Sequence, residues 1–248
     1  MYRFFIKEDL NKYDLSSIIH ASTACEALNP EVFNQFQAAT GLAITEGFGQ
    51  TETTLTIANL RGTPIKVGST GRPSPMYNVG IYALDGNKCP AGETGEICID
   101  ISKGDPCGLF LGYYLNEEQT NEVKHDGLYH TGDTAWMDED GYIWFVGRID
   151  DVIKSSGYSL GPLEIESVIM ELPYVLECGV SAVPDEIRGQ VVKASIVLVK
   201  GVEGTEELKK EIQNYVKEHT APYKYPRVVV FKDELPKTIS GKIKRNML

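Results

Sequence analysis

The spacing of apolar residues changes three times along the chain. Residues 30–40 carry apolar side chains at helical spacing and start with Pro30, a residue favoured at the first position of a helix. They are predicted to form a helix that Gly41 ends. A short strand over residues 42–44 is expected next, leading into a glycine-rich loop. The first part of the chain is therefore expected to combine helix and strand.

Between Gly68 and Arg148 the apolar residues alternate with polar ones, a period of two that is typical of strands. Short turns that contain Asp and Gly separate these runs, which indicates hairpins. The runs cover residues 79–84, 96–99, 134–137 and 142–146. This middle region is predicted to be a small antiparallel sheet or an open barrel.

After Asp150, helical and strand-like runs alternate again. Helices are predicted over residues 162–172 and 205–219, and strands over residues 178–183, 191–199 and 227–231. This part is expected to be a compact α+β unit. The whole chain is predicted to be a mixed α/β and α+β protein in three parts, residues 1–67, 68–149 and 150–248.

Composition narrows the class of protein. The chain has 248 residues, is 42% hydrophobic and has a net charge of -11, which is enough for one large domain or two modest ones. An acidic surface argues against nucleic acid as a partner, but a few local donors can still bind a small nucleotide. The five cysteines lack CxxC spacing, which indicates reduced thiols.

Targeting signals are not expected from this sequence. Charged residues at Arg3 and Lys7 come before any apolar run, so no signal peptide is predicted at the start. The most apolar stretch, residues 191–199, is too short to span a bilayer, so no transmembrane segment is predicted. A soluble, cytoplasmic protein is expected.

The hexapeptide over residues 47–52, Gly-Phe-Gly-Gln-Thr-Glu, is the first candidate for chemistry. Glycines allow a ligand to approach the backbone closely, and the Thr51 hydroxyl can donate to a phosphate oxygen. Glu52 offers a hard oxygen ligand for Mg²⁺. On these six residues alone, an ordinary glycine-rich turn is an equally good interpretation.

Residues 129–133, Tyr-His-Thr-Gly-Asp, are expected to form a short loop. A carboxylate such as Asp133 on a glycine turn can accept from both hydroxyls of a ribose, and Arg148 offers a second contact. An aspartate that caps its own turn is the commoner arrangement. His130 is expected to be structural, because the four histidines show no metal-ligand spacing.

Lys242 lies in the segment Ser-Gly-Lys near the end of the chain. This is not a P-loop, because Pro236 stands where that motif requires glycine. A lysine on a glycine turn suits a mobile cation that is delivered to developing negative charge. The alternative is a basic tail, since Lys244 and Arg245 follow closely.

Three segments together resemble an acyl-adenylate-forming enzyme in their order and separations. They are residues 47–52, residues 129–133 with 147–151, and residues 235–245. The closest resemblance is to the C-terminal half of a medium-chain acyl-CoA synthetase, and it covers essentially the whole chain. It implies the end of an α/β subdomain, a small β-barrel-like subdomain, and a mobile α+β domain that rotates about Asp150. It also implies an AMP-forming acid–CoA ligase that uses ATP and Mg²⁺ to activate a medium-chain or branched acid and passes it to coenzyme A.

The resemblance also implies roles for individual residues. Phe48 would pack on adenine, Thr51 would contact the α-phosphate, Glu52 would hold Mg²⁺, Asp133 and Arg148 would bind the ribose, and Lys242 would bridge the acid and the α-phosphate. Glu46, Gly47, Gly49 and Gln50 would complete the nucleotide site, and Ser156, Gly157, Tyr158, Arg188, Lys224 and Arg227 would contact coenzyme A. Gly49 stands where acetate-activating relatives have tryptophan, which implies a longer acid.

The chain departs from the family pattern in three places. Ser159 replaces the usual Lys or Arg after Gly-Tyr, and Cys25 replaces a glycine beside the nucleotide. A phosphate loop ending in Pro-Lys is not found, and residues 2–6 resemble the middle of a domain, so a partial enzyme is expected: a fragment, a split-gene product or a truncated chain. It would function with a missing N-terminal half or as a homodimer. The alternatives are an adenylation domain that serves a carrier protein, and a non-catalytic fragment.

Overall fold

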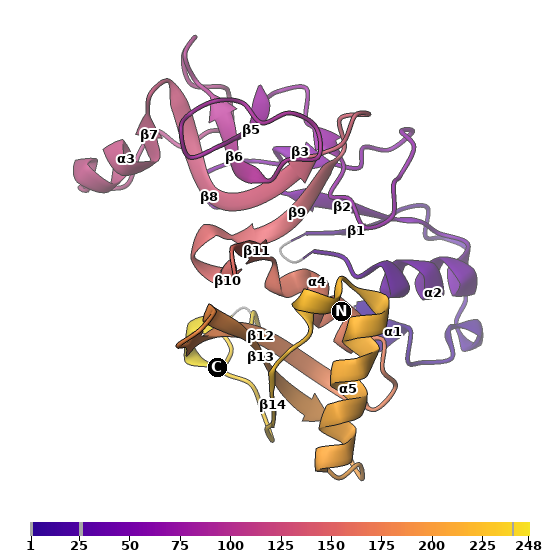
Figure 1. Cartoon of the computed structure of the whole chain (residues 1–248). Helices are drawn as coiled ribbons and strands as arrows, with labels where there is room; N and C mark the ends of the chain where they lie inside the picture. Colours follow the sequence, from indigo (N-terminus) through magenta and orange to yellow (C-terminus); the bar gives the residue numbers. More distant parts are fainter. Residues whose placement is uncertain (1, 25–26, 240) are drawn as a thin grey trace. The chain divides into compact units, whose positions relative to one another are not determined.

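The computed structural model describes residues 2–24, 27–239 and 241–248 (Figure 1). The chain divides into two compact units between Phe145 and Val146, and each is described by itself. The first unit contains two sheets, and the second contains one. The three-part division predicted from the sequence, with a hinge at Asp150, stays a prediction.

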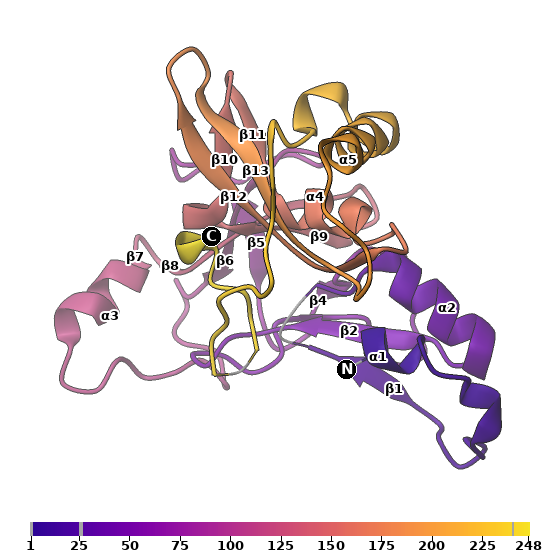
Figure 2. The same cartoon turned by 90° about the horizontal axis from the view of Figure 1, so that it is seen from below.

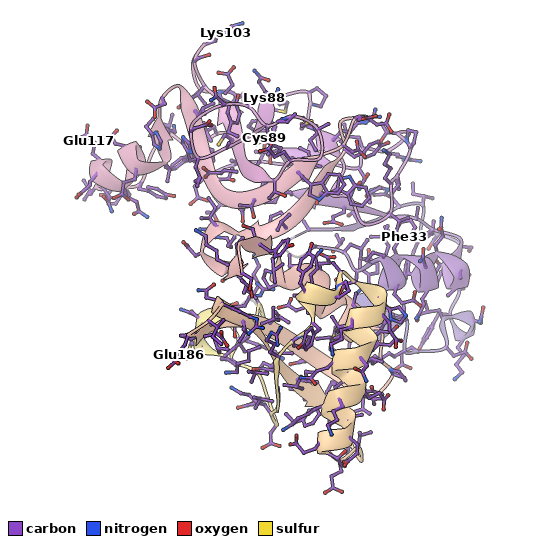
Figure 3. All side chains as sticks on the ribbon, viewed as in Figure 1. Phe33, Lys88, Cys89, Lys103, Glu117 and Glu186 are labelled. Atoms are coloured by element: carbon purple, nitrogen blue, oxygen red, sulfur yellow. The ribbon has the colours of Figure 1, made fainter. Side chains whose placement is uncertain are left out.

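The first sheet of the first unit has four strands in the order β1-β2-β3-β4. Its strands are β1 (Ala21–Thr23), β2 (Ile44–Phe48), β3 (Ile57–Ala58) and β4 (Arg72–Pro73), and the helices before β2 are α1 (Tyr2–Phe5), the 3-10 turn η1 (Leu10–Lys12) and α2 (Pro30–Thr40). β1 and β2 are parallel, and the other pairs are antiparallel. Phe33, labelled on α2 in Figure 3, is buried in a cluster with Phe36, Ala21 and Ile44.

The predicted first helix is confirmed, including both of its ends. The Asn29 side chain accepts a hydrogen bond from the Glu31 amide at 2.8 Å, and Gly41 ends the helix with a φ of 74°. The strand that follows begins two residues later than predicted and runs to Phe48. Gly47 and Phe48 therefore lie in β2, and the loop starts at Gly49.

The second sheet has five strands, with the order β5-β6-β8-β7 and β9 paired to β8. These strands are β5 (Val79–Tyr82), β6 (Gly95–Asp100), β7 (Lys124–His125), β8 (Leu128–Met137) and β9 (Ile143–Arg148), and the short helix α3 (Glu117–Val123) precedes β7. Alternate residues such as Ile97, Ile99 and Tyr129 form its buried face. The pairs β5–β6, β6–β8 and β7–β8 are antiparallel, as the sequence predicted for this region.

The prediction of a loop over residues 129–133 is wrong, because these residues lie within β8. The pairing of β8 with β6 explains the error. Glu96 pairs with Thr134 and Cys98 pairs with His130, so β8 has extra residues at this point and forms a bulge. Gly132 sits in the bulge with a φ of 68°, a conformation that glycine adopts readily. Glycine at a bulge resembles a loop when only the sequence is read.

The second unit is a five-stranded sheet in the order β11-β10-β13-β12, with β14 parallel to β13. Its elements are η2 (Ile149–Asp151), β10 (Ile153–Ser155), β11 (Tyr158–Leu160), α4 (Pro162–Ile169), β12 (Val175–Asp185), β13 (Gly189–Leu198), α5 (Glu206–His219), η3 (Pro222–Lys224), β14 (Val228–Phe231) and η4 (Arg245–Met247). The two helices α4 and α5 cover one face of the sheet (Figure 2). The α+β unit predicted from the sequence is confirmed.

Packing in the second unit places the C-terminal segment on the other face of β12. Val180 points into the cluster with Ile165 of α4 and Ile212 of α5. The preceding residue, Gly179, faces the opposite way. A side chain at Gly179 would meet Ile243 at 3.1 Å and Leu248 at 2.8 Å, so glycine here gives the C-terminal segment room to lie against the strand.

Candidate functional site

Gln50 is the centre of a hydrogen-bond network in the first unit. Its side-chain amide donates to Oδ2 of Asp133 at 2.6 Å and to the Thr131 carbonyl at 2.8 Å, and its Oε1 accepts from the Tyr129 hydroxyl at 2.8 Å. Asp133 is only 4% exposed. This bond connects the segment after β2 to the bulge of β8, about 80 residues away in the sequence. Both bonded side chains are candidate site residues.

Glu96 stabilises the bulge that carries Asp133. Because the bulge takes the Gly132 amide out of the regular strand pairing, that amide needs another acceptor, and Oε1 of Glu96 provides it at 2.8 Å. The Thr131 hydroxyl donates to the Ile97 carbonyl at 2.7 Å. Sequence reasoning missed Glu96. The available signal was its place on the same face of the strand as Cys98, two residues away.

The segment after β2 is held in a tight turn. The Gln50 amide donates to the Thr53 hydroxyl at 2.9 Å, and a Cβ on Gly49 would lie 2.5 Å from the Thr54 carbonyl oxygen. Gly49 is therefore required by the approach of the backbone, in addition to any effect on an acyl pocket. Thr51 is exposed, and Oε1 of Glu52 accepts from the Tyr113 hydroxyl at 2.9 Å.

Two further residues of this segment are placed by β2. The ring centroid of Phe48 lies 5.7 Å from that of Phe145. Glu46 is buried, and its carboxylate accepts from the Leu28 amide at 3.1 Å. Burial raises the pKa of Glu46 to about 7, although the bonds from Leu28 and Thr70 oppose this shift. Its predicted role beside the nucleotide, like that of Gly47, stays a prediction.

The predicted coenzyme A residues gather at one end of the second unit. Ser156 and Gly157 form the turn between β10 and β11 with positive φ values of 50° and 85°. The Ser156 amide donates to the Arg188 carbonyl at 3.1 Å, and Tyr158 stacks on Tyr223 with centroids 4.1 Å apart. Figure 3 labels Glu186 in the adjacent turn between β12 and β13.

Two basic residues at this end already contact other side chains of the protein, but of different kinds. The Lys224 ammonium lies 2.6 Å from one carboxylate oxygen of Glu164 and 2.7 Å from the other. The Arg227 guanidinium lies over the Tyr225 ring, 5.0 Å from its centroid. A phosphate that used Lys224 would have to compete with Glu164. The phosphate contacts predicted for Arg188, Lys224 and Arg227 stay predictions.

Lys242 lies in a hairpin near the C-terminus. The Thr238 amide donates to the Lys242 carbonyl at 2.8 Å, the Lys242 amide donates to the Thr238 hydroxyl at 3.0 Å, and Gly241 has a φ of 86°. The Lys242 side chain is exposed. The hairpin therefore fixes the backbone and presents the ammonium group to solvent.

Arg245 anchors this hairpin to the body of the second unit. Its guanidinium binds both carboxylate oxygens of Glu166, at 2.9 and 2.8 Å, and lies 3.3 Å from Asp151. Glu166 is 8% exposed and also accepts from the Val180 amide on the open edge of β12. The sequence interpretation treated Arg245 only as part of a basic tail, because a partner 79 residues away leaves no local pattern.

The two candidate regions of the second unit lie at opposite ends of β12. Lys237 of the hairpin forms an ion pair with Glu177, whereas Oδ1 of Asp185 accepts from the Arg188 amide. At ~3.3 Å per residue, Glu177 and Asp185 are roughly 26 Å apart along the strand. Figure 2 shows the hairpin and the turn between β12 and β13 at opposite ends of this unit.

Two further predicted positions are exposed, and a third lies outside the described residues. Arg148 is exposed at the end of β9, and Asp150 is exposed in the following η2. Arg148 belongs to the second unit and Asp133 to the first, so their joint contact with a ribose stays a prediction. Cys25, predicted to crowd the nucleotide, lies outside the described residues.

Two family models match this chain. Residues 1–114 match the model described as AMP-binding enzyme, and residues 164–242 match the AMP-binding enzyme C-terminal domain. The structure is similar to that of the anthranilate CoA ligase AuaEII in complex with anthranoyl-AMP. That comparison has a TM-score of 0.89 and 35% identity, over 99% of this chain and 47% of that one.

Similar curated sequences include two acyl-coenzyme A synthetases of Rattus norvegicus. The first, ACSM3, is 50% identical over 249 residues, and the second, ACSM4, is 48% identical over 250 residues. Each comparison covers 100% of this chain and 43% of the relative. The chain therefore spans less than half the length of the curated relatives that it matches.

The names of these relatives correct one prediction. Both are described as mitochondrial, which contradicts the cytoplasmic location expected from the sequence. Reduced cysteines and an acidic composition suit any reducing compartment, so they could not distinguish the two locations. Among the described residues, no helix has the length and apolar character needed to cross a membrane.

Proposed function

Because the chain belongs to the family of AMP-binding, adenylate-forming acyl-CoA synthetases, we propose that it forms the C-terminal half of the site at which a carboxylic acid is activated and joined to coenzyme A. The observation that carries this proposal is the 2.6 Å hydrogen bond between Gln50 and Asp133. It joins the segment proposed to bind phosphate and the segment proposed to bind ribose into one site. The acid is proposed to be of medium length or branched.

The reaction has two displacements at one site. The acid's carboxylate attacks the α-phosphorus of ATP and releases pyrophosphate, giving an acyl-adenylate. The thiol of coenzyme A then loses its proton, attacks the acyl carbonyl and releases AMP, giving the thioester. The protein supplies position and charge, and none of its own side chains forms a covalent intermediate.

Roles in the first displacement follow from the chemistry of each side chain. The buried Asp133 carboxylate is fixed by Gln50, so it can accept from the ribose hydroxyls without reorganisation. Phe48 is proposed to contact adenine, Thr51 the α-phosphate, and Arg148 the ribose. Lys242 is proposed to neutralise the charge that develops between the acid and the α-phosphate.

Mg²⁺ is proposed to bind at Glu52. A protein site for this ion commonly uses one or two carboxylates together with substrate phosphates, and a single carboxylate beside the proposed phosphate-binding Thr51 fits that donor set. The Tyr113 hydroxyl, 2.9 Å from Oε1, holds the carboxylate in place. When bound, the ion supplies positive charge to the phosphates.

The second displacement is proposed to use the other end of the second unit. Ser156, Gly157 and Tyr158 would line the path of the pantetheine arm, with Arg188 and Lys224 near the coenzyme's phosphates. The hairpin that carries Lys242 is tied to β12 at Glu177, and this turn adjoins the other end of β12 at Asp185, roughly 26 Å along the strand, so the two regions lie too far apart to contact one small reacting centre in a single position of the unit. This separation supports the proposed rotation about Asp150 between the two displacements.

The test is a fusion of this chain behind the N-terminal part of rat ACSM3 that it does not match. The fusion is assayed for exchange of labelled pyrophosphate into ATP with a series of short to medium-chain acids, and rat ACSM3 itself is the positive control. Exchange that depends on the acid is expected, and the series identifies the preferred chain length. A folded fusion that shows no exchange with any acid would contradict the proposal.

The same fusion protein distinguishes two alternative functions from the proposed one. An adenylation domain that serves a carrier protein would exchange pyrophosphate but would not form acyl-CoA when coenzyme A is supplied. A non-catalytic fragment would give a folded fusion that shows no exchange with any acid, so Lys242→Ala and Asp133→Ala would change nothing. Sedimentation of the 248-residue chain, alone and with the separate N-terminal part of ACSM3, would distinguish a homodimer from a chain that pairs with that part.

A further inference from the structure

Glu96, Cys98 and His130 gather on the face of the second sheet opposite to its hydrophobic core. Cys98 and His130 are paired directly across β6 and β8, and Glu96 lies two residues along β6, so all three side chains leave the same face. Nδ1 of His130 lies 2.9 Å from Oε2 of Glu96 and 3.7 Å from Sγ of Cys98. One ligand atom from each residue lies within 4.8 Å of the others.

These distances are close to those of a metal site. Around a tetrahedral Zn²⁺ with bonds of ~2.0–2.3 Å, ligand atoms are roughly 3.3–3.8 Å apart. Small side-chain movements would bring the three atoms to that spacing. Within the part of the chain that the structure describes, this is the one group of three such residues whose ligand atoms are so close.

The His130 ring directs Nδ1 toward the other two candidate ligands. Nε2 of His130 is buried and has no hydrogen-bond partner among the described residues, and the ring stacks on His125 with centroids 3.9 Å apart. A ring that binds a metal through Nδ1 carries its proton on Nε2. Nε2 lacks a partner with or without the metal, so the geometry of Nδ1, Glu96 and Cys98 carries the inference.

We infer that Glu96, Cys98 and His130 bind a thiophilic divalent cation such as Zn²⁺, with one further position for water. On binding, the Cys98 thiol releases its proton to solvent and its sulfur bonds to the metal. The thiolate and the Glu96 carboxylate then balance the charge of the ion. The inference does not depend on the proposed function, and the soft sulfur ligand separates this site from the Mg²⁺ site at Glu52.

The site also adjoins the bulge that carries Asp133. The metal would use Oε2 of Glu96, while Oε1 remains the acceptor of the Gly132 amide at 2.8 Å. His130 lies two residues before Gly132 in the same strand. A bound ion would therefore cross-link β6 and β8 on one side of the bulge without disturbing the contact that holds it.

The test uses the 248-residue chain, freed of metal by a chelator and titrated with Co²⁺ as a spectroscopic substitute for Zn²⁺. One Co²⁺ per chain is expected, with the near-ultraviolet absorption of a cobalt–thiolate bond and its displacement by Zn²⁺. X-ray absorption of the Zn²⁺ form of the unmodified chain is expected to give one sulfur among nitrogen and oxygen ligands. Absence of the thiolate band, or a metal shell without sulfur, would overturn the inference, and neither measurement requires a variant to fold.

Variants identify the ligands. Cys98→Ala is expected to abolish the thiolate band, and His130→Gln and Glu96→Gln are expected to weaken binding by at least about tenfold, since even the partners of metal ligands cost that much when removed. The matched controls are Cys107→Ser, an exposed cysteine, and His125→Gln, the stacked neighbour. Both should keep the band and the affinity. A band that is lost in Cys107→Ser and kept in Cys98→Ala would assign the metal elsewhere and refute this site.

Discussion

The Asp133 network and the Lys242 hairpin are built in contrasting ways. Asp133 is 4% exposed and is held by Gln50, while the side chain of Lys242 is exposed and only its backbone is fixed. A group that is proposed to bind a neutral ribose gains from being rigid before the ligand arrives. Lys242 is proposed to act in only one of the two displacements and must then be able to leave. This agrees with a hairpin that is held rigidly by Arg245 while the Lys242 side chain stays exposed.

The anchor of the hairpin is also largely buried and has several polar bonds. Arg245 forms two hydrogen bonds to Glu166 and an ion pair with Asp151. Polar groups therefore stabilise both regions, but in the second unit they lie at a distance from the proposed reacting group. In the hairpin, we therefore expect one residue to affect stability and another to affect activity. In the first unit, we expect the same residues to affect both.

The largest effect is expected when the anchor is broken. Arg245→Met leaves the Glu166 carboxylate buried without its cation, which typically costs ~3–5 kcal/mol. In urea, the transition of the second unit, followed by hydrogen exchange of α4 and β12, should move to lower concentration. Both tryptophans, Trp136 and Trp144, lie in the first unit, so the fluorescence transition should stay in place. Lys244→Ala, an exposed neighbour, is the matched control.

Substitution of the exposed Lys242 should change activity without changing stability. In the ACSM3 fusion, Lys242→Ala is expected to lower pyrophosphate exchange by ~10²–10³, as is typical for one electrostatic donor to a transition state. Its unfolding should not change. Thioester formation from supplied acyl-adenylate should be nearly unaffected, because Lys242 is proposed to act in the first displacement only.

Lys237→Ala is the control for this experiment, since Lys237 lies in the same hairpin and forms an exposed ion pair with Glu177. It should cost less than about 1 kcal/mol of stability and leave exchange almost unchanged. Equal losses of exchange for the two lysines would mean that the hairpin needs general positive charge, and not an ammonium at residue 242.

Sequence reasoning succeeded where the signal was local. The helix from Pro30 to Thr40 has its caps in the sequence, and the candidate residues Gln50 and Asp133 belong to short motifs. It failed where the partner was distant. The roles of Glu96 and Arg245 depend on residues 36 and 79 positions away. The bulge that Glu96 stabilises contains a glycine, and for that reason it was predicted to be a loop. Neither spacing has a period that a reader of one sequence could recognise.

Burial of a carboxylate in the first unit gives a pH-dependent test. Since burial raises the pKa of Glu46 from its ordinary value of 4.5 to about 7, the folded state favours the protonated form. Its contribution to stability is present below about pH 4.5 and is lost as the pH rises through about 7, by roughly 3 kcal/mol at most. The tryptophan-detected urea midpoint should therefore fall over this range. Glu46→Gln should remove most of that fall, whereas exposed Glu31→Gln should not.

The smallest expected effect addresses the link between the two motifs of the first unit. Gln50→Ala removes three hydrogen bonds at about 1 kcal/mol each, so a loss of ~1–3 kcal/mol is expected in the tryptophan-detected transition, together with weaker binding of AMP. A double-mutant cycle with Asp133→Ala should give a coupling energy of at least ~0.5 kcal/mol. Gln35→Ala, on the exposed face of α2, is the control. A coupling near zero would mean that the bulge and Glu96 alone position Asp133, and that the motif after β2 contributes to the ligand and not to the arrangement of the site.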